Sequence, residues 1–146
     1  MTTAAESTIR VLLAEDDANA RSVLTDLLES LGHTVVAQVG SGRDAVRRTQ
    51  EVTPDVVLLD VHMPDGSGID VMRHMEPAPT VGAIAMSGFA METDFLRSRE
   101  AGFHIHLTKP VEFAVLERAI GEISNGKRRR GSIVGRGANR GRSRSR

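Results

Sequence analysis

The sequence predicts an α/β fold in which helices cover both faces of a five-stranded parallel sheet, a doubly wound arrangement. Short runs of apolar and β-branched residues alternate along the chain with segments of helical periodicity. Parallel strands joined by crossover helices are buried on both faces, so they form continuous apolar runs. The five predicted strands are Ile9–Ala14, Val35–Val39, Val56–Leu59, Val81–Met86 and Phe103–Leu107.

The first and last predicted helices have the clearest patterns. Apolar residues recur at the i, i+3, i+4, i+7 spacing of one helix face. Gly32 follows the first of these patterns, where a glycine commonly ends a helix. The apolar positions are Ala20, Val23, Leu24, Leu27, Leu28 and Leu31 in the first helix, and Leu116, Ala119, Ile120 and Ile123 in the last. Weaker patterns predict helices over Gly42–Glu51, Ser67–Met75 and Met91–Ala101.

The fifth strand differs from the other four because its residues alternate in polarity. His104 and His106 stand between Phe103, Ile105 and Leu107. Alternation is typical of a strand with one less buried face, so we expect an edge strand.

Length and composition indicate one domain without disulfides. The chain has 146 residues, of which 40% are hydrophobic and 26% charged, and it contains no cysteine. No apolar run approaches the roughly 20 residues that span a bilayer, and the first residues lack a signal-peptide pattern. We therefore expect a cytoplasmic protein without membrane contact, with an extension over residues 1–7, a domain over 8–124 and a tail over 125–146.

The neutral overall charge conceals a division between the domain and the tail. Residues 1–126 hold all 19 acidic residues and 10 basic ones, a net charge of −9, whereas residues 127–146 hold nine basic residues. The Gly, Ser and Arg content of the tail predicts disorder. The tail could contact nucleic acid phosphates without sequence preference, fold back on the acidic site in competition with Mg²⁺, or be only a solvated extension.

Acidic residues follow the first and third predicted strands. Asp60 closes the apolar run that starts at Asp55, and Glu15, Asp16 and Asp17 follow the first strand. Carboxyl ends of parallel strands meet at the edge where such sheets bind ligands. Crowded carboxylates are unfavourable without a cation, and oxygen ligands suit Mg²⁺. Capping of the first helix by Asp16 or Asp17 is the alternative, and Asp60 favours the metal site.

A hydroxyl and an ammonium group follow the fourth and fifth strands. Ser87 stands beside Gly88, and Lys109 precedes Pro110. Alone, the serine is typical of a turn and the lysine of a solvated surface charge. Together, four strands thus bring two acids, one acid, one hydroxyl and one ammonium group to one edge of the sheet.

Over residues 8–124 the chain resembles the receiver domain of two-component response regulators, in its single-domain, chemotaxis-regulator-like form. The resemblance implies a flavodoxin-like (βα)₅ domain with strand order 2-1-3-4-5. It implies that Asp60 is the phosphoacceptor, that Glu15 and Asp16 bind Mg²⁺ with it, and that Ser87 and Lys109 contact the phosphoryl oxygens.

Further residues take roles only through this resemblance. Met63-Pro64 and Gly68 stand at the offsets from the phosphoacceptor that the family shows. The resemblance implies that the main-chain carbonyl of His62 is a metal ligand and that the Lys109-Pro110 bond is cis. It also implies that the side chains of His62 and Phe89 tune the phosphoryl lifetime, with ordinary loop residues as the alternative.

Two positions depart from the family pattern. His106 stands where the family often has Tyr or Phe, and Ser67 where aspartate is common. The resemblance makes Ser87 and His106 the switch pair, in which movement of the serine lets the side chain at 106 rotate inward. A pH-sensitive contact and a half-exposed edge histidine are the alternatives. We expect Ser67 to change only loop hydrogen bonds.

The resemblance implies a phosphoacceptor signalling domain rather than an enzyme. Its partners would be a sensor histidine kinase or a histidine phosphotransfer protein, and an output protein at the face of the fourth helix, fifth strand and fifth helix. The tail is too short for an output domain. The alternatives are a phosphate-relay intermediate or phosphate sink, and a nucleic-acid-associated regulator acting through the tail.

The histidines do not predict a zinc site. They show no pair at helical i, i+4 spacing, and no cysteine accompanies them. His104 and His106 share one side of a strand, which would allow weak metal binding. The other three are His33, His62 and His74.

Overall fold

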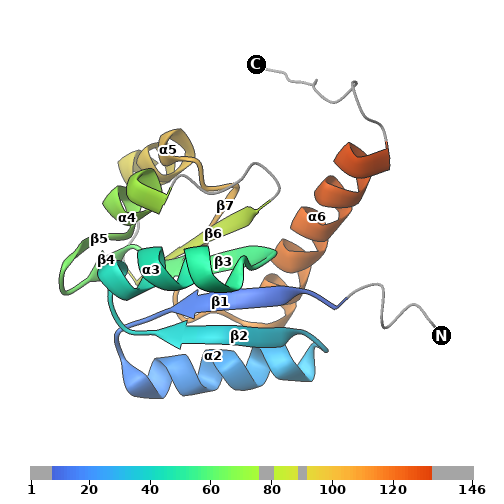
Figure 1. The fold of residues 1–146 in the computed structure, drawn as a ribbon, viewed down its shortest axis with the longest axis horizontal. Coiled ribbons are helices and arrows are strands. Elements are labelled where there is room, and N and C mark those ends of the chain that lie inside the picture. Colours follow the sequence, from blue (N-terminus) through green and yellow to red (C-terminus); the bar gives the residue numbers. More distant parts are fainter. Residues whose placement is uncertain (1–7, 76–80, 89–91, 133–146) are drawn as a thin grey trace.

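The computed structural model describes residues 8–75, 81–88 and 92–132. Its main sheet has five parallel strands in the order β2-β1-β3-β6-β7 (Figure 1). Numbered along the chain, the strands of this sheet have the order 2-1-3-4-5, which confirms the doubly wound fold. They are β1 (Arg10–Ala14), β2 (Thr34–Val39), β3 (Val56–Asp60), β6 (Gly82–Ser87) and β7 (Ile105–Thr108).

Two further short strands form a hairpin that the sequence did not predict. β4 (His62–Met63) and β5 (Gly66–Ser67) pair in antiparallel fashion immediately after β3. The amide of Gly68 donates to the carbonyl oxygen of Val61 at 2.7 Å and closes the loop. The hairpin therefore fixes the path of the chain that leaves Asp60.

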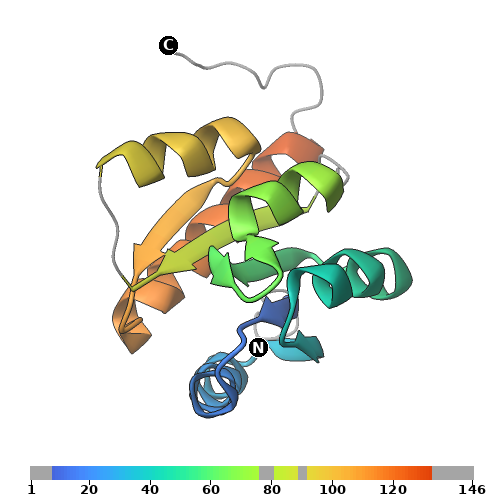
Figure 2. The same cartoon turned by 90° about the vertical axis from the view of Figure 1, so that its left-hand side faces the viewer.

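Helices cover both faces of the sheet (Figure 2). α3, α4 and α5 contribute to one side of the core, and α2 and α6 to the other. The helices are α2 (Ala18–Ser30), α3 (Gly42–Val52), α4 (Gly68–Met75), α5 (Glu92–Ala101) and α6 (Phe113–Ser132).

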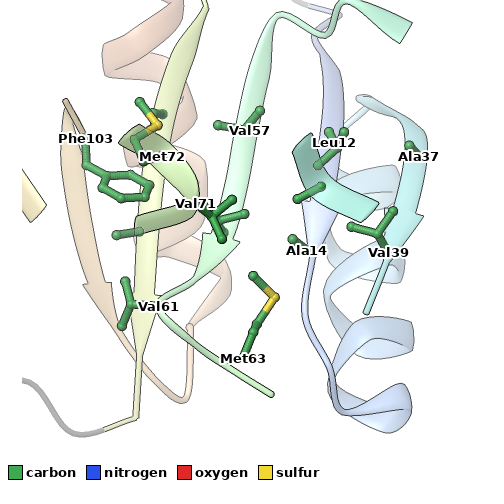
Figure 3. Packing of buried hydrophobic residues seen from close by; sticks show 14 residues of the cluster. Leu12, Ala14, Ala37, Val39, Val57, Val61, Met63, Val71, Met72 and Phe103 are labelled. Carbon is green, nitrogen blue, oxygen red and sulfur yellow. The ribbon is translucent and has the colours of Figure 1, made fainter. Parts of the chain in front are cut away.

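Residues that alternate along each strand contribute to two separate hydrophobic clusters, one on each face of the sheet. Leu12 and Val57 point into the cluster that holds Val71 and Met72 of α4 and the adjacent Phe103 (Figure 3). Their chain neighbours point to the opposite face, where the second cluster contains Leu13, Leu58, Ile84, Leu28 of α2 and Leu116 of α6. Burial on both faces explains why β1, β3 and β6 have continuous apolar sequences.

Helix α2 begins and ends as its sequence indicates. Asp17 is its N-cap, and Asp17 Oδ2 accepts from the amide of Ala20 at 2.8 Å. Gly32 follows the helix with a φ of +91°, a left-handed conformation that favours glycine. The capping alternative therefore holds for Asp17.

Helix α6 continues beyond the predicted end of the domain. It runs to Ser132, whereas we expected a disordered tail from residue 125. Lysine and arginine are good helix formers, and extending an existing helix costs far less than nucleating one. Residues 133–146 lie outside the described residues, so disorder there stays a prediction. Within the described ranges, no helix combines the length and apolar character that crossing a bilayer requires.

Strand β7 occupies one edge of the sheet, as predicted from its alternating sequence. It pairs with β6, the neighbouring strand in the sheet order. Leu107 is buried, whereas Ile105 and His106 are half-buried. The edge position leaves His106 close to both β6 and α5.

His33 connects the loop after α2 to the start of β1. Its Nδ1 accepts from the amide of Ile9 at 3.2 Å. Burial lowers the pKa of His33 below its ordinary value of 6.5. The neutral ring therefore supports this end of the sheet, because a protonated Nδ1 has no lone pair to accept with.

We expect the free energy of unfolding to fall in acid partly through His33. The unfolded chain binds a proton more readily there, so the contribution is present above about pH 6.5 and is lost as the pH falls below it. In His33→Gln the side chain keeps an acceptor oxygen but does not titrate. Urea unfolding at about pH 8 and about pH 5.5 should show a smaller acid loss in this variant. An equal loss in both proteins would contradict the assignment.

Candidate functional site

The ends of β1 and β3 bring three carboxylates together. Glu15 and Asp16 follow β1, and Asp60 ends β3. One oxygen from each lies within 4.8 Å of the others, the arrangement needed to hold one metal ion. Glu15 and Asp60 are only 1% and 4% exposed, whereas Asp16 is exposed. The predicted convergence of acids is therefore present.

Lys109, which follows β7, lies between the two buried acids. Its Nζ donates to Asp60 Oδ2 at 2.8 Å and to Glu15 Oε1. Burial works to lower the pKa of Lys109, but hydrogen bonds to Asp60 and Glu15 and their charges outweigh it and raise the pKa. Its amide donates to the carbonyl oxygen of Ser87 at 2.8 Å, and the Lys109-Pro110 bond is cis, as the resemblance implied.

Backbone amides hold the second oxygen of each buried acid. The amide of His62 donates to Asp60 Oδ1 at 2.9 Å, and the amide of Asp17 donates to Glu15 Oε2 at 3.0 Å. Arg21 of α2 donates from Nη1 to the carbonyl oxygen of Glu15 at 2.6 Å. The carboxylates are therefore oriented by the loops before any ligand binds.

The charges of the site suit a divalent cation. Lys109 and Arg21 bring two positive charges to the three carboxylates, which leaves a net negative charge. Uncompensated charge in a buried site is costly, and a hard cation with oxygen ligands would offset it. The residues present fit Mg²⁺ by donor type, by charge and by proximity.

Ser87, at the end of β6, is fully buried and bonds to His106. Ser87 Oγ lies 2.9 Å from His106 Nε2, and the other ring nitrogen, Nδ1, lies 3.0 Å from Ser98 Oγ on α5. The predicted pair of Ser87 and His106 is therefore in direct contact. Ser98 was missed, because a serine within a helix carries no sequence signal for a distant partner.

The hairpin after Asp60 is tied to helix α3 through Asp65, which sequence reasoning also missed. Its carboxylate accepts from the amides of Gly42 and Arg43 at 2.8 and 2.9 Å. Hydrogen bonds from these two amides lower the pKa of Asp65. Its position between Pro64 and Gly66 indicated a turn, but nothing in the sequence indicated that Asp65 would contact α3.

The remaining residues of interest lie apart from the carboxylates or outside the described residues. The side chain of His62 is exposed. Phe89 lies outside the described residues, as does the N-terminal extension over residues 1–7, and the side chain of Ser67 is not described. Nδ1 of His104 accepts from the amide of Ala83 at 3.1 Å, and Nδ1 of His74 lies 2.9 Å from the carbonyl oxygen of Asp70.

Comparison with known proteins identifies the family. The model of the response regulator receiver domain matches residues 11–121. The chain belongs to this family.

Several relatives agree with this assignment. The chain is 33% identical over 111 residues to the transcriptional regulatory protein PdtaR of Mycobacterium tuberculosis, an alignment that covers 76% of this chain and 54% of that protein. The chain thus spans about half the length of this relative. It is 29% identical to the chemotaxis protein CheY of Thermotoga maritima, in an alignment that covers 79% of this chain and 97% of that protein.

A solved structure shows the same similarity. A two-component response regulator of the LuxR family from Aurantimonas superposes with a TM-score of 0.77 at 30% identity, covering 82% of this chain and 86% of that one. Receiver domains are signalling domains rather than typical enzymes. They take up a phosphoryl group on an aspartate and bind Mg²⁺ at an acidic pocket, and they interact with histidine kinases or phosphotransfer proteins and with output proteins.

Gly68 allows α4 to start against the backbone of Asp60 and Val61. A Cβ there would lie 2.6 Å from the carbonyl oxygen of Asp60 and 2.7 Å from the Cα of Val61. Gly121, in α6, offers a matched control because a Cβ there would meet nothing within 4 Å.

We expect Gly68→Ala to lower the free energy of unfolding by about 2 kcal/mol or more, because backbone must move to admit the methyl group. Gly121→Ala should raise it by about 0.5 to 1 kcal/mol, because alanine favours a helix interior. Chemical denaturation of both variants measures this. Equal stability of the two variants would show that Gly68 does not restrict the loop.

Proposed function

We propose that Asp60 accepts a phosphoryl group from a sensor histidine kinase or a histidine phosphotransfer protein, with Mg²⁺ bound beside it. One observation carries the proposal: Asp60 is a buried strand-end carboxylate that shares Lys109 with Glu15 and lies within 4.8 Å of Glu15 and Asp16. Glu15, Asp16, Asp60 and the main-chain carbonyl of His62 would hold the ion.

The chemistry requires positioning and charge neutralisation rather than a strong base. An oxygen of Asp60 attacks phosphorus, the P–N bond to the donor histidine breaks, and the released imidazole keeps the electron pair and takes a proton. Bound Mg²⁺ supplies positive charge to the phosphoryl oxygens. Lys109, already 2.8 Å from Asp60 Oδ2, can transfer its hydrogen bond to the incoming phosphoryl oxygens.

Ser87 and the faces of α5, β7 and α6 would carry the change to a partner. Through its contact with His106, Ser87 joins the end of β6 to the strand that bears His106. Phe95 and Leu96 of α5 and Phe113 of α6 are large apolar residues that remain 38%, 55% and 45% exposed. Exposed apolar groups of this kind support an output protein docking there.

Two alternative functions can be distinguished by experiment. Rapid return of the phosphoryl group to a phosphotransfer protein would indicate a relay intermediate or a phosphate sink. Salt-sensitive nucleic acid binding that is lost with residues 127–146 would indicate a regulator acting through the tail. Partner binding that depends on phosphorylation would support a phosphorylation-dependent switch, which is the function we favour.

The phosphoacceptor can be tested with a small acyl phosphate. We expect the protein with Mg²⁺ to gain one phosphoryl group, seen by intact mass spectrometry, and Asp60→Asn to gain none because an amide is a poor nucleophile. Asp17→Asn is the matched control, because the side chain of Asp17 caps α2 and the variant should be labelled like the parent. Labelling of Asp60→Asn at the parental level would refute the assignment.

The adjacent residues Asp16 and Asp17 allow a separate test of metal binding. We expect Asp16→Asn to weaken Mg²⁺ binding about tenfold or more, because it removes a charged ligand, while Asp17→Asn retains the parental affinity. The chain has no Trp or Tyr, so isothermal calorimetry is a suitable measurement. Equal affinities of the two variants would argue against Asp16 as a ligand.

A further inference from the structure

The imidazole of His106 lies between two buried hydroxyl groups. Its Nε2 is 2.9 Å from Ser87 Oγ, and its Nδ1 is 3.0 Å from Ser98 Oγ. The two serines are 0% and 2% exposed, respectively. The ring of Phe95 packs against the imidazole with centroids 4.5 Å apart. One side chain thus connects the end of β6 with α5.

Counting hydrogens gives the tautomer of this histidine. Ser98 Oγ donates its single hydrogen to the carbonyl oxygen of Phe95 at 3.0 Å, since a carbonyl can only accept. Ser98 Oγ must therefore accept from His106, which places the ring hydrogen on Nδ1. In the neutral ring Nε2 is then an acceptor, so Ser87 donates its only hydroxyl hydrogen to it.

We propose that Ser98 and His106 are positioning residues that hold the Ser87 hydrogen away from the phosphoryl group until His106 is protonated. This inference rests on the proposed function. Phosphoryl oxygens accept hydrogen bonds, so Ser87 can bind them only as a donor. In the neutral state its hydrogen is already engaged by Nε2.

Protonation changes the direction of one hydrogen bond. When Nε2 takes a proton from solvent, Nε2–H donates to Ser87 Oγ, and the bond from Nδ1 to Ser98 persists. The hydrogen of Ser87 is then available to a phosphoryl oxygen. Phosphorylation of Asp60 and protonation of His106 therefore favour each other, and the coupling is equal in both directions.

The surroundings of His106 permit this proton uptake. A pocket of about 250 Å³ lies beside the ring and is also lined by Arg99 of α5 and His104 of β7. Among the described residues, these are the titratable or charged groups that line the pocket; β6 has none, and Arg97 and Glu100 of α5 are exposed. The carbonyl oxygen of Ser87 accepts from the amide of Lys109 at 2.8 Å, and the side chain of Lys109 contacts Asp60 and Glu15. Arg99 opposes a charge on His106, and a phosphoryl group would favour it.

The full chain can be tested by following the imidazole resonances of His106 by NMR from about pH 5 to about pH 8. Beryllofluoride with Mg²⁺ serves as the stand-in for the phosphoryl group, and Mg²⁺ alone is the reference. We expect beryllofluoride to raise the pKa of His106 by about one unit, and to bind about tenfold more tightly below that pKa than above it. His33, hydrogen-bonded at the start of β1, should not respond.

Variants separate this role from packing alone. In Ser98→Ala the neutral ring can carry its hydrogen on Nε2, so beryllofluoride affinity near pH 8 should rise toward its acid value. Ser98→Thr keeps the hydroxyl and should keep the parental pH dependence. His106→Phe removes the titrating group and should show a weaker pH dependence than the parent.

The outcomes are distinguishable. An unchanged pKa of His106 with beryllofluoride bound, or parental pH dependence in Ser98→Ala, would overturn the inference and leave the proposed function intact. Failure of the parent chain to bind beryllofluoride with Mg²⁺ at any pH would overturn the proposed function and this inference with it.

Discussion

The ammonium of Lys109, held between the buried carboxylates of Glu15 and Asp60, is the interaction on which the rest of the site depends. Three strand ends supply these groups, and only the parallel order of the sheet brings them to one edge. Removing the lysine would leave two buried anions close together, which is unfavourable without another cation. With the lysine present, the neutralisation is only partial. The fold therefore tolerates the site without metal while retaining the charge to attract one.

The two sides of the site differ in how firmly they are fixed. On the acidic side, Lys109 and backbone amides engage both oxygens of Glu15 and of Asp60, and Asp65 anchors the following hairpin to α3. The direction of these hydrogen bonds is fixed, because ionised carboxylates can only accept hydrogen bonds. On the side of Ser87, a hydroxyl and an imidazole can each donate or accept, so two hydrogen-bond arrangements are available without movement of the backbone. The site thus combines carboxylates whose hydrogen bonds are fixed with a neighbouring hydroxyl group, that of Ser87, whose hydrogen bond can reverse.

Sequence predicts this molecule well where local pattern and topology carry the information. Continuous apolar runs located the strands, and the rule that ligands bind at the carboxyl edge placed Asp60, Glu15 and Lys109 together before their distances were known. The adjacent Asp16 and Asp17 could not be told apart, because only the direction of the chain leaving β1 brings the first to the carboxylates of Glu15 and Asp60 and makes the second a helix cap. The bonds from Asp65 to α3 and from Ser98 to His106 join separate elements, so neither follows from periodicity. The hairpin after Asp60 was missed because strands of two residues have no detectable alternation.

The identity of residue 106 bears directly on how easily Ser87 can act. A phenylalanine at this position would offer no acceptor, and the Ser87 hydrogen would have to find another partner or remain available. The histidine does offer one, and Ser98 ensures that the acceptor nitrogen is the one facing Ser87. In the arrangement we propose, a half-buried histidine on the edge strand would also act as the switch residue. The edge position would admit the solvent that delivers a proton, and the buried serines would determine which hydrogen bond that proton reverses.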